Sequence, residues 1–135
     1  MIAMVCIDDH GGMMFNNRRQ SRDQVLQKNM INLSQNKKLY LNHYSYELFE
    51  PFCPANTIID DEFLLKAKGG DYCFVENRSL IPYEEKIEEL IVYKWNRNYP
   101  ADFFLDIPLK NRQLIKSVDF RGFSHEKITM EIYIK

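Results

Sequence analysis

The sequence predicts an α/β domain of three layers, α/β/α, with a mixed, mostly parallel sheet that ends in an antiparallel C-terminal strand. Residues 1–7, 71–75 and 90–93 are apolar runs without polar alternation, typical of strands covered on both faces. Residues 128–134 alternate apolar with polar side chains, typical of a half-buried antiparallel strand. A length of 135 residues with 45% hydrophobic content suits a single domain, 1–135, with a substantial core.

The elements follow from local signals taken in order. Residues 1–7 form the first strand, and turn residues 8–12 end it. Ser21-x-x-Gln24 resembles a capping box, and the apolar residues that follow give a loose helical stripe to Leu33. The further expected elements are a strand at 39–41, a helix at 44–49 with Ser45 as a possible N-cap, an edge strand at 57–59, a helix from Asp60 or Asp61 to Lys66 or Lys68, a strand at 71–75, a helical turn at Pro82, a strand at 90–93 and a strand at 113–120.

The apolar runs also predict an order for the sheet. We expect residues 1–7 at its centre, flanked by residues 71–75 and 90–93, because these runs have no polar face. The last strand, residues 128–134, should run antiparallel beside residues 90–93.

Composition limits the partners. The net charge of −1 provides no global field toward nucleic acid or membrane. No apolar run approaches the ~20 residues of a membrane span, and Asp8 and Asp9 interrupt the first apolar run, so a signal peptide is not expected. The three cysteines have no short spacing, which is typical of reduced thiols in a cytoplasmic protein. The three histidines lack ligand spacing, so no metal site is predicted.

One stretch combines an acid with several cations near a helix start. Asp23 falls in the first helical turn, and Arg18, Arg19 and Arg22 lie within five residues. Arginine forks and free helix N–H groups both suit phosphate or carboxylate, and His43 could join them from the end of the second strand. This predicts a pocket for a small anionic or heterocyclic ligand, with Asp23 on its wall. The alternative is a solvated basic loop paired with Asp8, Asp9 and Asp23.

Four stretches, taken together, carry a resemblance to a known family. They are the opening strand with its Gly-Met loop and Asp-bearing helix, residues 39–47 (Leu-Tyr-Leu-Asn-His-Tyr-Ser-Tyr-Glu), residues 90–93 followed by 101–104 (Ala-Asp-Phe-Phe), and residues 123–125 (Phe-Ser-His) before the last strand. In this order they resemble dihydrofolate reductase, as a divergent and shortened member. The resemblance implies that Asp23 anchors a pterin ring and supports its protonation. It also implies that Ser45 lies near a nicotinamide, that Tyr93 faces the cleft, and that NADPH is the cofactor.

The chain departs from the family pattern at four places. Gln27 replaces an aromatic residue that packs on the pterin, and Asn56 replaces the arginine that grips the folate tail. Residues 17–19 (Asn-Arg-Arg) replace Met-Pro-Trp in the active-site loop. Glu76-Asn77 replaces the Gly-Gly pair that cradles the cofactor pyrophosphate. We therefore predict that NADPH does not bind tightly.

Two functions of different class remain from the sequence. The first is a reductase acting on a pterin-like small molecule, with Asp23 as acid or anchor. The second is a non-catalytic module that binds an anionic ligand or nucleotide. An RNA-processing role is a further alternative, although the His-x-His-x-Asp-His motif of the two-zinc nucleases named ribonuclease Z is absent. Ser124 and His125 are expected to set the turn before the last strand.

Overall fold

A seven-stranded mixed sheet forms the centre of the computed structural model, which describes residues 1–135. Its strand order is β5-β4-β6-β1-β7-β10-β9. The strands are β1 (Ile2–Ile7), β4 (Leu39–Leu41), β5 (Thr57–Ile59), β6 (Tyr72–Phe74), β7 (Glu89–Lys94), β9 (Gln113–Phe120) and β10 (Ile128–Ile134). The neighbouring strands β5, β4, β6, β1 and β7 all pair in parallel. Strand β10 pairs antiparallel with both β7 and β9.

The predicted sheet order is confirmed. Strand β1 lies between β6 and β7, and β10 runs antiparallel beside β7. The physical reason is burial, because the side chains of β1 pack on both faces of the sheet: Ala3 and Val5 belong to one core cluster, and Ile2 and Met4 to the other.

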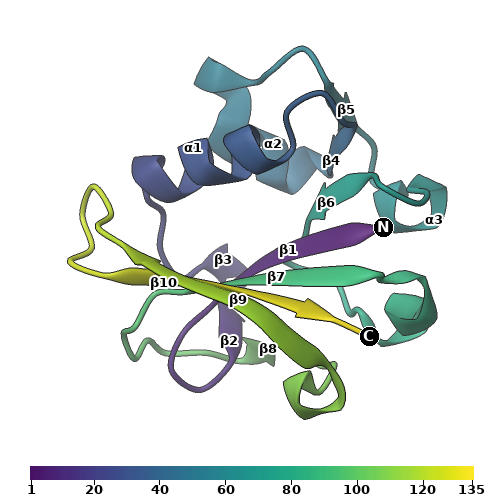
Figure 1. The fold of residues 1–135 in the computed structure, drawn as a ribbon. Coiled ribbons are helices and arrows are strands. Elements are labelled where there is room, and N and C mark those ends of the chain that lie inside the picture. The colour runs from purple at the N-terminus through teal and green to yellow at the C-terminus, as the bar shows by residue number, and fades with distance from the viewer.

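Different elements cover the two faces (Figure 1). Helices α1 (Gln24–Leu33) and α2 (His43–Phe49) cover one face, where Leu26, Met30 and Leu48 pack on the sheet. The other face is covered by the short helix α3 (Phe63–Lys66), the 3-10 turn η2 (Ile81–Lys86) and a small antiparallel sheet. That small sheet has the order β3-β2-β8, with β2 (Gly12–Phe15), β3 (Arg18–Arg19) and β8 (Phe103–Phe104). Two further 3-10 turns are η1 (Glu50–Phe52) and η3 (Leu109–Asn111).

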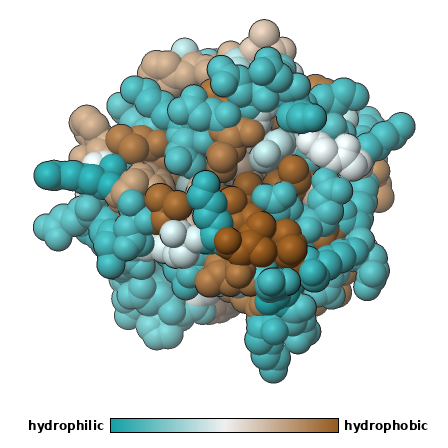
Figure 2. Space-filling model, viewed as in Figure 1, coloured by the Kyte–Doolittle hydropathy of each residue, from teal (hydrophilic) through white to brown (hydrophobic).

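Strand β9 forms an exposed edge of the large sheet. It exposes Leu114, Ile115 and Val118, and Figure 2 shows apolar side chains gathered near the middle of the face on which β9 lies. None of the helices has the length and apolar content needed to cross a bilayer.

Both predicted N-caps are wrong by two or three residues. Asp23, not Ser21, caps α1, because its carboxylate accepts hydrogen bonds from the N–H groups of Val25 and Leu26. Asn42, not Ser45, caps α2, and its side chain accepts from the Ser45 N–H at 2.9 Å. In each case an amide or carboxylate nearby serves as the cap instead of the hydroxyl. The helix expected after Asp60 is also shorter than predicted, spanning only Phe63–Lys66.

A two-residue turn forms the hairpin that carries two of the arginines. Asn16 and Asn17 have φ angles of 52° and 60°, which asparagine tolerates better than most residues. Positive φ at both central residues is the geometry of a tight hairpin turn, and it pairs Met14 with Arg19 and Phe15 with Arg18. The turn thereby directs Arg19 toward α2 and leaves Arg18 exposed.

Candidate functional site

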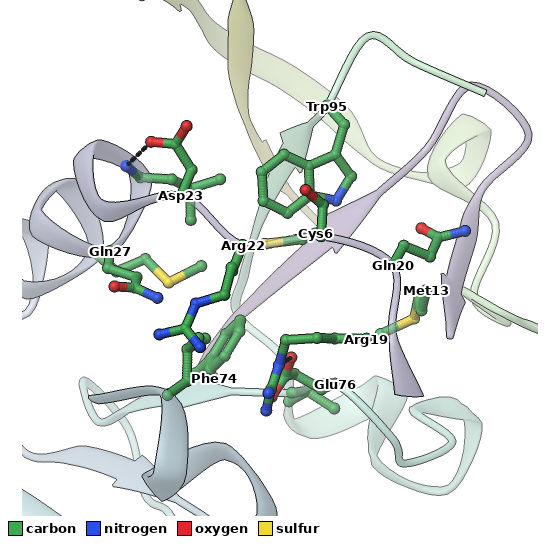
Figure 3. Close-up of a pocket in the computed structure, with 15 residues that line it drawn as sticks. Cys6, Met13, Arg19, Gln20, Arg22, Asp23, Gln27, Phe74, Glu76 and Trp95 are labelled. Carbon is green, nitrogen blue, oxygen red and sulfur yellow. Dashed lines mark hydrogen bonds and ion pairs between the residues drawn. The ribbon is translucent and has the colours of Figure 1, made fainter. Parts of the chain in front are cut away.

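A pocket opens where β1, β3, β6 and α1 meet (Figure 3). The space between its lining atoms is about 400 Å³ when the open mouth is counted, but the cavity itself is only about 20 Å³, which is close to the room that one water needs. Its apolar wall includes Leu26, Met30, Leu48, Phe74 and Trp95. Its polar lining includes Arg19, Gln20, Ser21, Arg22, Asp23, Gln27 and Glu76.

Both oxygens of the Asp23 carboxylate accept hydrogen bonds from the protein. Its Oδ1 accepts from the N–H groups of Val25 at 2.9 Å, Leu26 at 3.3 Å and Phe123 at 2.9 Å. Its Oδ2 accepts from the Ser124 N–H at 3.0 Å. None of the side chain is exposed, and Figure 3 shows the carboxylate turned away from the Arg22 and Gln27 side chains. Asp23 therefore borders the pocket while its carboxylate joins α1 to the turn before β10.

The same carboxylate holds a buried histidine. His125 Nδ1 lies 2.9 Å from Asp23 Oδ2, and its Nε2 lies 3.0 Å from the Ser21 hydroxyl and 3.3 Å from the Tyr99 hydroxyl. The imidazole stacks on Trp95 with ring centroids 4.6 Å apart. Burial opposes ionisation of Asp23, but the hydrogen bonds from Phe123, Ser124 and His125 outweigh it and hold the pKa at about 2.

Gly122 permits this close approach. A β-carbon at this position would lie 2.5 Å from Asp23 Oδ2 and 2.8 Å from the Ile128 side chain. Only glycine leaves room for the carboxylate against the turn.

Arg19 and Glu76 form an ion pair on one wall. Arg19 donates to both Glu76 oxygens, from Nε at 2.9 Å and from Nη2 at 3.0 Å, and Ser45 donates to Glu76 Oε1 at 2.8 Å. The Arg19 guanidinium also lies over the Tyr44 ring, 4.6 Å from its centroid. Arg19 thus pairs with Glu76, not with the acids expected on the solvated-loop interpretation, and its charge is already neutralised.

Two polar atoms of the pocket have no partner. Gln27 Nε2 and Gln20 Oε1 are buried without a hydrogen bond, and Gln27 is only 6% exposed. Arg22 is exposed at the mouth, and Figure 3 shows its guanidinium pointing into the pocket on the side of Gln27 and Phe74. A buried donor without a partner costs about 1–3 kcal/mol, so this end of the pocket has unmet hydrogen-bonding capacity.

The other sequence-predicted residues lie elsewhere. Arg18 borders a separate, wider hollow with Tyr99 and Pro100. His43 is exposed and pairs with Asp61 at 3.1 Å. Tyr93 is fully buried and donates to Asn29 Oδ1 at 2.5 Å, and burial raises its pKa. Of the predicted site residues, the pocket lining brings together Arg19, Arg22 and Asp23.

Sequence reasoning missed Gln27, Glu76 and Ser21 as lining residues of the pocket, and His125 as the residue that contacts both Ser21 and Asp23. Gln27 and Glu76 did carry a signal, because both are polar residues where the resembled family has aromatic or glycine residues. Ser21 and His125 carried none, since 104 residues separate them in the chain. The structure contains no group of three or more His, Cys, Asp or Glu side chains placed to hold a metal ion.

Comparison with solved structures identifies the fold. The chain superimposes on dihydrofolate reductase from Enterococcus faecalis, solved with NADP(H) and RAB-propyl, with a TM-score of 0.68 over 98% of this chain and 94% of that one. Sequence identity is 12%, so the likeness concerns the fold alone. No family model and no curated protein matches the sequence.

The arrangement is therefore an α/β fold with a small pocket beside its central strand. More particularly, it is a dihydrofolate reductase-like fold, and the prediction of that fold is confirmed.

The residues after β6 do not fit the cofactor that this fold family implies. A pyrophosphate needs glycine at this place so that backbone N–H groups can approach it. Here Val75, Glu76 and Asn77 follow β6, and the Glu76 carboxylate is buried between Arg19 and Ser45. A large acidic side chain thus stands where the family has glycine, and it holds the Arg19 guanidinium that could otherwise pair with a phosphate.

Proposed function

We propose that this protein binds a small molecule that combines an apolar body with a carboxylate or similar acceptor group, in the pocket between β1, β6 and α1. The observation that carries the proposal is the buried Gln27 Nε2, which faces the pocket without a partner. Buried polar groups without partners are rare in folded proteins, and such a group in a pocket often awaits a ligand.

Charge and shape agree with this class of ligand. Arg22 offers a guanidinium fork at the same end of the pocket, and guanidinium pairs with carboxylates through two parallel hydrogen bonds. Phe74 and Trp95 give the opposite walls an apolar and aromatic surface. A ligand donor could in addition reach the unpaired Gln20 Oε1. The ligand would therefore lie with its acceptor toward Gln27 and Arg22.

The test is calorimetric titration with benzoate and butyrate as probes. Arg22→Ala should weaken binding about tenfold, which corresponds to about 1.4 kcal/mol. The matched control is Arg18→Ala, which removes the same charge from a residue that borders the other hollow. Equal affinities for the two variants would contradict the proposal.

A second variant separates binding from folding. Gln27→Leu has a similar shape and removes the unpaired donor, so we expect it to raise the unfolding free energy by about 1 kcal/mol. The same change should weaken binding of the probes. A Gln27→Leu protein that is less stable than the parent would show that the amide has a partner within the fold.

The second candidate is a reductase that acts on a pterin-like molecule. It is favoured by the place of Asp23, which caps α1 at the border of the pocket. It is disfavoured because both carboxylate oxygens already accept hydrogen bonds. Following the 340 nm absorbance of NADPH with dihydrofolate as substrate tests it, and we expect no turnover.

A further inference from the structure

Ser21 and Asp23 line the pocket, and a buried histidine behind them connects their side chains. The Ser21 hydroxyl lies 3.0 Å from His125 Nε2, and His125 Nδ1 lies 2.9 Å from Asp23 Oδ2. Serine, imidazole and carboxylate in this order and at these distances form the arrangement that activates a serine for attack on an acyl carbon. The three residues come from the segment before α1 and from the turn before β10, so only the fold brings them together.

The contacts of the two ring nitrogens of His125 favour one tautomer. Asp23 Oδ2 is ionised at neutral pH and faces His125 Nδ1, so Nδ1 carries the ring proton. In this tautomer Nε2 is the acceptor, and the Ser21 O–H can donate to it. The Tyr99 hydroxyl, at 3.3 Å, is a second and longer contact of the same nitrogen.

The imidazole is held firmly in this orientation. The His125 side chain is 4% exposed and stacks on Trp95, with planes inclined by 30°. Asp23 is itself fixed by hydrogen bonds from the backbone on both of its oxygens. Asp23 is thus a positioning residue, because it acts on the serine only through the histidine.

The serine lines the pocket. Ser21 is partly exposed and lines the same pocket as Arg22, Trp95 and Gln27. A carbonyl group in this pocket would lie near a hydroxyl that is paired with a base. Arg22 places a positive charge in the same pocket, where negative charge would develop on the carbonyl oxygen.

We propose that Ser21 is an acyl-accepting nucleophile, with His125 as its general base and Asp23 as the positioning acid, and that the pocket takes small carboxylic esters. The inference rests on the proposed function in one respect, since it needs a pocket that is open to small molecules. It goes further by adding a reaction at a defined atom.

The reaction balances with water as the second reactant. Ser21 Oγ forms a bond to the ester carbonyl carbon, and its proton passes to His125 Nε2. The intermediate collapses as the bond from carbon to the alcohol oxygen breaks, and the imidazolium returns its proton to that oxygen. Water then attacks the acyl–serine ester with His125 again as base, which releases the carboxylic acid and restores the Ser21 hydroxyl.

The side chains that line the pocket indicate the class of substrate. The apolar side chains Leu26, Met30 and Phe74 suit a short acyl group, and the unpaired Gln27 Nε2 suits an acceptor such as a carbonyl or carboxylate. The product acid belongs to the ligand class proposed above. It would remain bound near Arg22 until it is exchanged for substrate.

The test is labelling with a fluorophosphonate probe followed by peptide mass mapping. We expect one phosphonyl group per chain on Ser21, and no label in Ser21→Ala. The matched control is Ser124→Ala, because Ser124 Oγ lies beside the same imidazole at Nδ1, 3.2 Å away, and not at Nε2. Ser124→Ala should keep the label on Ser21. His125→Gln should slow labelling roughly 100-fold, as expected for loss of a general base.

Hydrolysis of p-nitrophenyl acetate gives a second readout. The parent protein should show a burst of nitrophenolate that is absent in Ser21→Ala, and the melting temperature of that variant should confirm that it is folded. An unlabelled Ser21, or a label on another residue in the folded protein, would overturn the inference. Binding of benzoate that persists in Ser21→Ala would leave the proposed ligand pocket intact, so the two failures are distinguishable.

Discussion

Replacing Asp23 by asparagine should destabilise the protein by about 2–3 kcal/mol at neutral pH. The carboxylate caps α1 and also accepts hydrogen bonds from Phe123, Ser124 and His125. Its pKa of about 2, against an ordinary 3.8, corresponds to about 2 kcal/mol of stability at neutral pH. Asparagine keeps one acceptor oxygen but turns an NH₂ group toward donors, which leaves the Ser124 N–H or His125 without a partner.

The assay is urea unfolding followed by circular dichroism, with Asp119→Asn as the control. Asp119 belongs to the hairpin that contains this turn, but its side chain is 57% exposed, so its loss should cost less than about 1 kcal/mol. A loss in Asp23→Asn no larger than in Asp119→Asn would refute the reasoning.

The same carboxylate predicts a dependence on pH. The pKa of Asp23 is lower in the folded protein than in the unfolded chain, so the unfolded chain binds more protons as the pH falls. The contribution of Asp23 to the unfolding free energy is therefore fully present above about pH 5. It should be lost progressively between about pH 5 and pH 2. The parent protein should therefore show a steeper loss of stability in this window than Asp23→Asn does.

Three further predictions concern the pocket wall and the fold. Glu76→Ala should lower the unfolding free energy by about 3 kcal/mol, because it leaves Arg19 without its partner. A double-mutant cycle with Arg19→Ala, measured by urea unfolding, should give a coupling free energy above about 1 kcal/mol. Gly122→Ala should cost about 1–3 kcal/mol, measured in the same way, because the new methyl group meets the Asp23 carboxylate. The dissociation constant of NADPH in calorimetry should be larger than about 1 μM, which corresponds to a binding free energy near −8 kcal/mol, because Glu76 stands where the family has glycine. A smaller dissociation constant would show that this wall can rearrange.

The order of the large sheet could be predicted because its signal is local. Residues 1–7 have no polar side, and residues 128–134 alternate, so each run specifies how many of its faces are covered. The edge position of β9 was not predictable in this way, since its sequence has apolar residues that the structure leaves exposed. Exposure at an edge depends on which strands pair, and not on the strand itself.

The site was less predictable because its contacts are distant in the chain. Asp23 was correctly placed at a helix start, yet the sequence could not show that a turn 100 residues later would occupy its carboxylate. Arg19 and Glu76 pair across 57 residues, and neither has a local pattern that selects the other. The Asn16-Asn17 turn is different, because two adjacent residues tolerant of positive φ are a readable hairpin signal that was overlooked.

The most direct test of the ligand pocket is a crystal structure of the protein with the carboxylate that binds it most tightly in calorimetry. We expect a carboxylate oxygen within about 2.7–3.2 Å of Gln27 Nε2 and a second contact to the Arg22 guanidinium. The apolar part of the ligand should lie against Phe74 and Trp95. A ligand that sits instead in the hollow beside Arg18, with Gln27 Nε2 bonded to a protein acceptor, would contradict the proposal.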